Sequence, residues 1–85
     1  GNATSAMTEK EERERQKLQK KFGEHLRKIR KAKGISASEL AKRCFMERSN
    51  IARIEMGRMN PSLYMLKKLC EGLELTLIEF FQGFE

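Results

Sequence analysis

Apolar side chains recur along most of this chain at the three- and four-residue spacing that places them on one face of an α-helix. The first such run contains Phe22, Leu26 and Ile29. Gly34 follows it, and glycine readily takes the left-handed backbone conformation that ends helices. The pattern therefore predicts an amphipathic helix that begins at Phe22 and ends just before Gly34.

A short second helix is indicated by Ser36 and Glu39. Their three-residue spacing is that of a capping box, in which a serine or threonine and a glutamate close the first helical turn reciprocally. We predict about two turns of helix after this cap, followed by a turn at Phe45 and Met46.

Three more helices are predicted in the rest of the chain. One runs from about residue 47 to 56 and is ended by Gly57. The next is capped by Asn-Pro-Ser at 60–62, with the proline in its first turn. Its apolar stripe comprises Leu63, Leu66, Leu69, Cys70 and Leu73. The last begins at a second capping box, Thr76 with Glu79. Its apolar residues are Leu77, Ile78, Phe80, Phe81 and Phe84.

The N-terminal quarter of the chain lacks this periodicity. Residues 9–21 are almost wholly Glu, Arg, Lys and Gln, and Leu18 is their only large apolar residue. We therefore predict that 7–21 is a charged, solvent-exposed helical extension. Residues 1–6 are small and polar, and we interpret them as a remnant left by an expression vector. The predicted domain then occupies residues 22–85.

Composition supports an all-α fold with one hydrophobic core. Val and Asp are absent and Ile and Thr total only eight residues, whereas Lys, Arg, Glu, Leu and Met are abundant. A chain of 85 residues can bury a single core and leaves no room for a separate catalytic or effector-binding domain.

Several classes of function are disfavoured by the sequence. It contains no glycine-rich phosphate loop, no metal-ligand cluster and no nucleophile with an evident base, so we predict neither an enzyme nor a cofactor. Cys44 and Cys70 are far apart and are interpreted as buried, reduced thiols, and His25 lacks partners for metal binding. No apolar stretch could span a membrane, and we expect a cytoplasmic protein.

The charge of the chain is distributed unevenly. Residues 17–58 carry 13 positive and 4 negative side chains, whereas residues 69–85 carry four Glu and no base. A one-sided basic surface suits a polyanion such as nucleic acid, because each neutralised phosphate releases counterions. An ordinary solvated helix face is the alternative, and charge alone does not decide between them.

Three segments carry a resemblance to a known family: GISASELA at 34–41, RSNIARIEMG at 48–57 and NPS at 60–62. Together they resemble the xenobiotic-response-element (XRE) helix-turn-helix family of phage repressors and Cro proteins, over about residues 22–81. The resemblance implies a five-helix, lambda-repressor-like DNA-binding domain. A small residue, here Ala41, is also what two helices need where they meet closely through a short turn.

The resemblance also implies roles for individual residues. It places the residues that contact base edges in the first turns of the third helix: Arg48, Ser49, Asn50 and Arg53. Arginine can grip guanine and asparagine can grip adenine in the major groove. The positions implied for phosphate contacts are Ser36, Ala37, Arg43 and Arg58, with Ser36 and Ala37 acting through the helix N-terminus. Arg30 and Glu55 match an ion pair that braces the third helix.

Two positions depart from the pattern of the family. Ala37 occupies a position that often carries a phosphate-binding Gln. Phe45 occupies a turn position that is often Gly, so either this residue adopts a less common backbone conformation or the turn differs.

The resemblance favours a dimeric repressor or autoregulator that binds a palindromic operator in double-stranded DNA. Phe80, Phe81 and Phe84 exceed what one inner helix face can bury, so we predict a homodimer interface there, with pure core packing as the alternative. The small size is similar to that of restriction-modification controllers and small phage repressors. A second class of function stays open: an antitoxin or other module whose acidic C-terminal end binds a small protein partner, with DNA binding secondary.

Overall fold

The computed structural model describes residues 8–85. This part of the chain forms five helices and no strand, which confirms the expected all-α fold. The helices are α1 (Glu9–Ala32), α2 (Ala37–Cys44), α3 (Arg48–Glu55), α4 (Leu63–Gly72) and α5 (Leu77–Phe80). The interpretation of residues 1–6 as a vector remnant lies outside the described residues.

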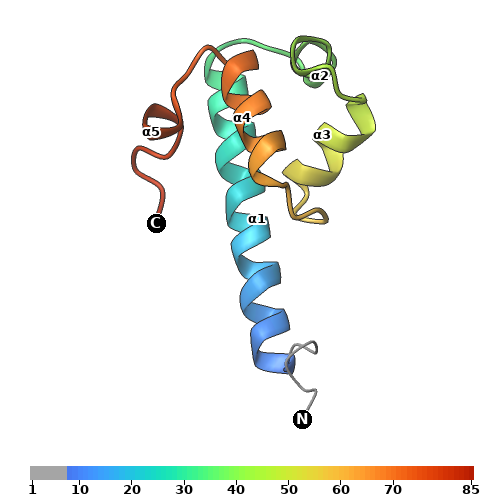
Figure 1. Ribbon diagram of the computed structural model, residues 1–85, viewed down its shortest axis with the longest axis vertical. Helices are drawn as coiled ribbons and strands as arrows, with labels where there is room; N and C mark the ends of the chain where they lie inside the picture. Colours follow the sequence, from blue (N-terminus) through green and yellow to red (C-terminus); the bar gives the residue numbers. More distant parts are fainter. Residues whose placement is uncertain (1–7) are drawn as a thin grey trace.

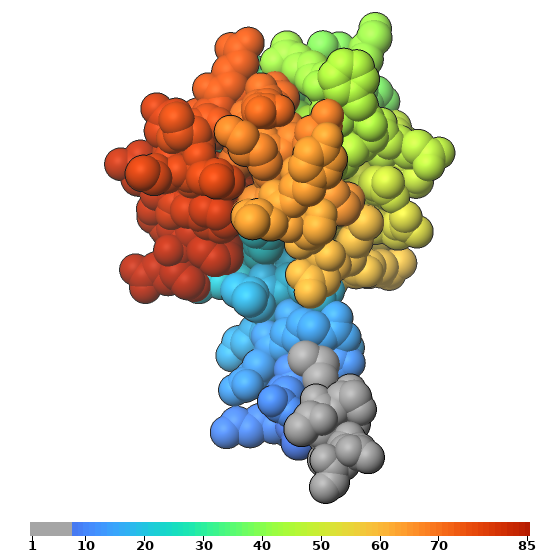
Figure 2. All heavy atoms as spheres, in the orientation of Figure 1, coloured from blue at the N-terminus to red at the C-terminus, as the bar shows by residue number. Residues whose placement is uncertain are grey.

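Helix α1 runs the length of the molecule, and the other helices gather around its C-terminal half (Figure 1). The molecule measures 47 × 27 × 19 Å along its principal axes. In the space-filling view the N-terminal half of α1 projects from the rounded body (Figure 2). Within residues 8–85, no helix combines the length and the apolar composition that crossing a bilayer requires.

The predicted extension and the predicted first helix form one continuous helix of 24 residues. The helix begins at a capping box that was not predicted: the Thr8 hydroxyl accepts a hydrogen bond from the Glu11 N–H at 3.1 Å, and the Thr8 N–H donates to the Glu11 carboxylate at 3.0 Å. No Gly or Pro interrupts residues 9–21, and their Glu, Lys, Arg and Gln favour helix, so the helix propagates into the domain without a break.

The extension is also attached to the domain by a buried polar residue. Gln19, which we expected to be exposed, is buried, and its amide donates to the Gly57 carbonyl oxygen at 3.1 Å. The Gln19 side-chain oxygen accepts from Arg15 at 2.7 Å. Gln19 is buried because it lies one turn before Phe22 on the same helix face, which places it against the loop after α3.

Residues from all five helices form the core. Its fully or nearly fully buried apolar residues are Phe22, Leu26, Ile35, Leu40, Ala41, Cys44, Ile51, Ile54, Leu69, Cys70, Leu73 and Phe80. Cys44 and Cys70 are both free and buried, as predicted, and burial raises the pKa of each thiol. The Cys44 thiol donates to the Lys68 carbonyl oxygen at 3.3 Å and so joins α2 to α4, whereas Cys70 acts as a small apolar group in the core.

Two details of α4 differ from the prediction. Its N-cap is Ser62, whose hydroxyl accepts from the Met65 N–H at 3.1 Å, so Pro61 precedes the cap and does not lie in the first turn. Leu63 was expected in the apolar stripe but is 73% exposed. It is the first residue of the helix, and the packing of α4 against the core begins with Met65 and Leu66.

Of the two predicted capping boxes, the one at α5 is complete and the one at α2 is only half formed. Thr76 and Glu79 form the predicted box at the start of α5. At α2 only half of the box is present: the Ser36 hydroxyl accepts from the Glu39 N–H at 3.0 Å, but the Glu39 carboxylate accepts from Arg43 instead. Arg43 lies four residues on, on the same helix face, and competes for the carboxylate.

The aromatic C-terminal end divides into core and surface. Helix α5 has only four residues, and Phe81 and Phe84 lie beyond it. Phe80 is 0% exposed and packs on Phe22 with ring centroids 5.5 Å apart, so its assignment to a dimer interface is wrong: it closes the core. His25 fixes this segment, because its Nε2 lies 2.5 Å from the Phe80 carbonyl oxygen.

Candidate nucleic-acid interface

Helices α2 and α3 meet through a tight turn that places Phe45 in an unusual conformation. Ala41 of α2 is buried, as a close approach of the two helices requires. Phe45 has φ 56° and ψ 41°, the left-handed region, so the less common backbone conformation is the one adopted. Its N–H and that of Met46 donate to carbonyl oxygens of α2, which ends the helix. The Phe45 ring is 86% exposed.

The end of α3 packs directly on the backbone of α1 at Gly23. A Cβ atom at this position would lie 2.3 Å from the Ile54 carbonyl oxygen and 2.5 Å from that of Glu55. No side chain larger than hydrogen fits between the two helices here. The role of Gly23 is not apparent from the sequence, since a glycine inside a helix pattern gives no sign of what lies opposite.

A buried ion pair joins the same two helices. Arg30 donates to the Glu55 carboxylate through Nε at 2.6 Å and through a terminal nitrogen at 2.9 Å. Its other terminal nitrogen donates to the Ile35 carbonyl oxygen at 2.9 Å. The side chains are only 10% and 9% exposed, and the hydrogen bonds that Arg30 donates to the Glu55 carboxylate raise the pKa of Arg30. Arg30 thus faces inward and stays charged.

Gly57 forms a third attachment between α3 and α1. Its φ is +74°, and a Cβ atom there would lie 2.7 Å from the Lys20 Cα. Glycine is needed at this position both for the positive φ and for the close approach. Together with the Gln19 bond to its carbonyl oxygen, this contact fixes the loop after α3 against the middle of α1.

The outer face of α3 carries the residues expected to contact bases. Ile51 and Ile54 are fully buried, whereas Arg48, Ser49 and Arg53 are exposed. Asn50 is half-buried, and its side-chain oxygen accepts a hydrogen bond from Arg53. The structure therefore presents polar side chains on a helix that is held rigidly from behind, which is the arrangement that base reading in the major groove requires.

The residues expected to contact phosphate lie around this helix. Ser36 caps α2 and is exposed, and Ala37 opens the helix, whose first N–H groups have no partner within it. Arg58 is exposed in the loop after α3. Arg43 is exposed too, but its guanidinium donates to Glu39 at 3.1 Å and to the Gly72 carbonyl oxygen at 3.3 Å. Arg43 therefore already links α2 to the end of α4.

Comparison with known proteins agrees with this arrangement. The family model HTH_3, described as Helix-turn-helix, matches residues 26–80. The control protein C.MunI of Mycoplasma sp is 38% identical over 66 residues, which are 76% of this chain and 89% of that protein. The crystal structure of the restriction-modification controller protein C.AhdI from Aeromonas hydrophila has a TM-score of 0.70 and 39% identity, covering 73% of this chain and 94% of that one.

A longer relative matches over part of its length. The HTH-type transcriptional regulator SlrR of Bacillus subtilis (strain 168) is 40% identical over 63 residues, which are 73% of this chain but only 41% of that protein. The region matched by the family model, residues 26–80, contains α2, α3, α4 and α5 in full. By sequence and by structure, the chain belongs to the XRE-type helix-turn-helix family HTH_3.

Proposed function

We propose that this protein is a sequence-specific DNA-binding transcriptional regulator. The observation that carries the proposal is the outer face of α3, where Arg48, Ser49 and Arg53 are exposed while α1 holds the helix from behind. In the proposed complex α3 enters the major groove, and the two arginines donate to guanine O6 and N7. Asn50 contacts adenine after Arg53 exchanges its hydrogen bond with Asn50 for one with a base.

Phosphate contacts orient α3 in this proposal. The N-terminus of α2 at Ser36 and Ala37 binds one phosphate through backbone N–H groups, and Arg58 binds another. Arg43 contributes only if it leaves Glu39 or Gly72, which makes it the weakest of the proposed contacts. We further propose that the protein acts by binding and not by catalysis, as the family match supports.

The two controllers indicate the kind of regulation. Both are matched over most of their length, 89% of C.MunI and 94% of C.AhdI. We therefore propose a restriction-modification controller or a regulator of similarly small size. The match to SlrR supports transcriptional regulation in general, because it covers less than half of that protein.

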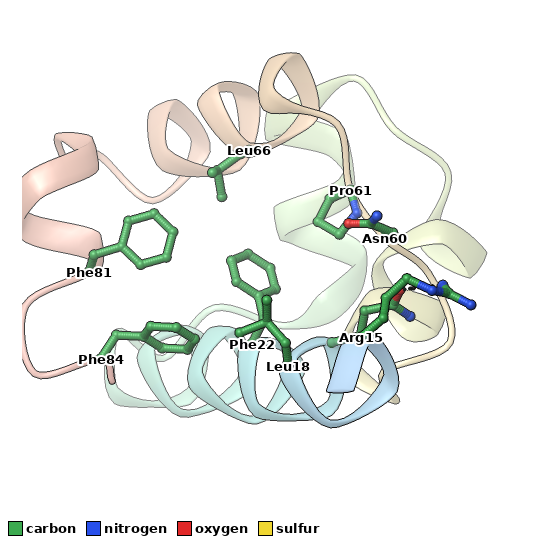
Figure 3. Close-up of a pocket in the computed structure, with 9 residues that line it drawn as sticks. Arg15, Leu18, Phe22, Asn60, Pro61, Leu66, Phe81 and Phe84 are labelled. Atoms are coloured by element: carbon green, nitrogen blue, oxygen red, sulfur yellow. Dashed lines mark hydrogen bonds between the residues drawn. The ribbon is translucent and has the colours of Figure 1, made fainter. Parts of the chain in front are cut away.

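We propose that the protein binds DNA as a homodimer. An apolar hollow of about 250 Å³ lies between α1, α4 and the C-terminal segment. Figure 3 shows Leu18, Leu66, Phe81 and Phe84 around this space, with Phe22 at its base. Phe81 and Phe84 are half-buried and Leu18 is 56% exposed, so a second copy that covered the hollow would bury apolar surface from each.

Selection from a random DNA library tests the proposed function. The wild-type protein should enrich one motif with two inverted half-sites whose centres lie about one helical turn, or 34 to 36 Å, apart, because a two-fold dimer presents two α3 helices. Enrichment of a single unrepeated half-site would refute the proposed dimer but would still support sequence-specific DNA binding. Recovery of no motif at all would refute the proposed function.

A further inference from the structure

The outer side of α1 carries a row of basic side chains that the base-reading surface does not use. Successive residues of a helix are rotated by about 100°, so the solvent-facing side, which flanks the buried stripe of Gln19, Leu26 and Arg30 and extends round behind it, can be read from the sequence. We call the basic residues on that side the α1 basic row. Its members are Lys10, Arg13, Lys17, Lys20, Lys21, Arg27, Lys28 and Lys31.

The row is exposed and almost free of neutralising partners. All eight side chains are exposed. Within residues 8–85, only Arg13 of the row forms an ion pair, a solvent-exposed one with Glu9 at 3.9 Å. The exposed acids on the same side are Glu9, Glu11, Glu14 and Glu24, half as many as the basic residues of the row. The row therefore has a clear positive excess, and such a surface attracts a polyanion.

The row is fixed in position relative to α3. Lys20 lies against Gly57, whose neighbour in the chain is the proposed phosphate contact Arg58. Arg13, Lys20 and Arg27 are spaced by seven residues and so lie nearly in line along α1. This line passes beside the end of α3 at Lys20 and continues along the half of α1 that projects from the body (Figure 2).

The projecting half of α1 is long enough to reach beyond a half-site. From Lys20 to the start of α1 at Glu9 the helix rises by about 16 Å, at 1.5 Å per residue. DNA rises by about 3.4 Å per base pair, so this length corresponds to about five base pairs. A rigid basic helix of this length, starting beside a phosphate contact, fits a continuation of the same duplex.

We infer that Arg13, Lys17 and Lys20 bind phosphates of DNA that flanks the operator half-site. Helix α1 then extends the footprint by about three base pairs, because Arg13 lies about 10 Å along the helix from Lys20. It does so without reading sequence, since side chains of this kind contact backbone and not base edges. The inference rests on the proposed function, since it needs a duplex already positioned by α3. A lipid surface is the other polyanion that such a row could meet, and its attachment beside α3 favours DNA.

The test uses two duplexes that contain the selected operator, one ending at the outermost enriched base pair and one extended by ten base pairs on each side. Dissociation constants are measured by fluorescence anisotropy between 50 and 200 mM salt. The wild type should bind the extended duplex more tightly, with a steeper salt dependence. R13Q/K17Q/K20Q should lose this difference, with a slope lower by about two to three units on the extended duplex.

Matched variants separate position from net charge. K33Q/K42Q/K67Q removes three charges elsewhere on the exposed surface and should keep the wild-type difference between the duplexes. R13K/K17R/K20R should keep it too, and circular dichroism shows whether each variant retains its helical content. If R13Q/K17Q/K20Q does not fold, the three single substitutions are measured instead. Each should lower the slope of the salt dependence by about one unit.

The outcomes distinguish the inference from the proposed function. If the wild type selects no operator, the proposed function fails. If it selects one but binds both duplexes alike, or if both triple glutamine variants lose the difference equally, only the inference fails. Binding of phosphatidylserine vesicles that R13Q/K17Q/K20Q alone abolishes, with DNA binding unchanged, would assign the row to a lipid surface and also overturn it.

Discussion

Arg30 directs its guanidinium nitrogens to partners within the protein, the Glu55 carboxylate and the Ile35 carbonyl oxygen. A charge that is hydrogen-bonded in this way costs little to bury, but it becomes expensive when its partner is removed. The residue therefore braces α3 and is not available as a DNA contact. Its partner, Glu55, is the position where this account of the scaffold can be tested.

Glu55→Gln should lower the free energy of unfolding by about 3 kcal/mol, because it leaves a buried guanidinium without its counter-charge. Urea denaturation followed by circular dichroism measures the change. Glu39→Gln is the matched control: its pair with Arg43 is 39% and 46% exposed, and such surface pairs contribute about 0 to 1 kcal/mol. Equal losses in the two variants would contradict the bracing role.

Arg58→Ala tests the proposed phosphate contact beside α3. The variant should weaken binding to the operator and to a scrambled duplex alike, and it should lower the salt slope by about one unit, because a phosphate contact carries no sequence information. Titrations of both duplexes at several salt concentrations measure this. A loss confined to the operator, with the slope unchanged, would mean that Arg58 reads bases.

Some of the residues that attach α3 to α1 could be predicted from the sequence, whereas others could not. The Arg30 and Glu55 pair followed from the resemblance, and the structure contains it. Gly57 was recognised as a helix stop, but its close approach to Lys20 was not, and Gly23 was overlooked. These contacts depend on how two helices approach in space, which a one-dimensional pattern does not contain.

In the turn between α2 and α3, the fold requires a backbone conformation that phenylalanine does not favour. A left-handed conformation costs a residue with a Cβ about 1 to 2 kcal/mol relative to ordinary backbone, and Phe45 adopts it with its ring largely in solvent. The ring makes one favourable contact, since the Lys68 ammonium lies 4.9 Å from its centroid. The fold thus retains a residue that local preference would not choose.

Phe45→Asn should raise the free energy of unfolding by about 0.5 to 1 kcal/mol, because asparagine tolerates the left-handed region. Phe45→Ala is the control, since it removes the same ring but keeps the strain, and it should not stabilise the protein. Thermal or urea unfolding measures both variants. A stability of the asparagine variant equal to or below that of the alanine variant would contradict the strain.

The length of the last helix, α5, could not be predicted from the apolar pattern. The capping box at Thr76 correctly marked the start of α5, but the apolar residues that follow suggested a longer helix than the four residues observed. Phe81 and Phe84 are held by contacts with Phe22 and His25 from α1. The end of α5 is therefore accompanied by tertiary packing that the sequence does not reveal, and by Gly83, whose φ is +80° and whose stop signal the apolar pattern outweighed.

For the whole molecule, the hollow beside Phe84 is the feature on which the proposed dimer depends. Leu18→Gln tests it more cleanly than a change of a phenylalanine, because Leu18 is 56% exposed and lies outside the core. The variant should keep its helical content but raise the dimer dissociation constant at least about tenfold, since burying one leucine stabilises by about 1.5 to 3 kcal/mol.

Ile78→Gln is the control for that experiment. Ile78 is also an exposed apolar residue, at 84%, but it does not line the hollow, so its replacement should leave the association unchanged. Sedimentation equilibrium at micromolar concentrations measures all three proteins. A wild type that is already monomeric at tens of micromolar, or a Leu18 variant that dimerises like the wild type, would show that the hollow is not the interface.

The central claim, that the outer face of α3 reads DNA sequence, is tested most directly by repeating the random-library selection with Arg48→Ala/Arg53→Ala. Each arginine should contribute about 1 to 3 kcal/mol of discrimination, so the variant should still retain DNA through its basic surface but enrich no motif, or a motif degenerate at the positions that the arginines contact. Enrichment of the wild-type motif, at wild-type information content, would contradict the account and place sequence reading outside α3.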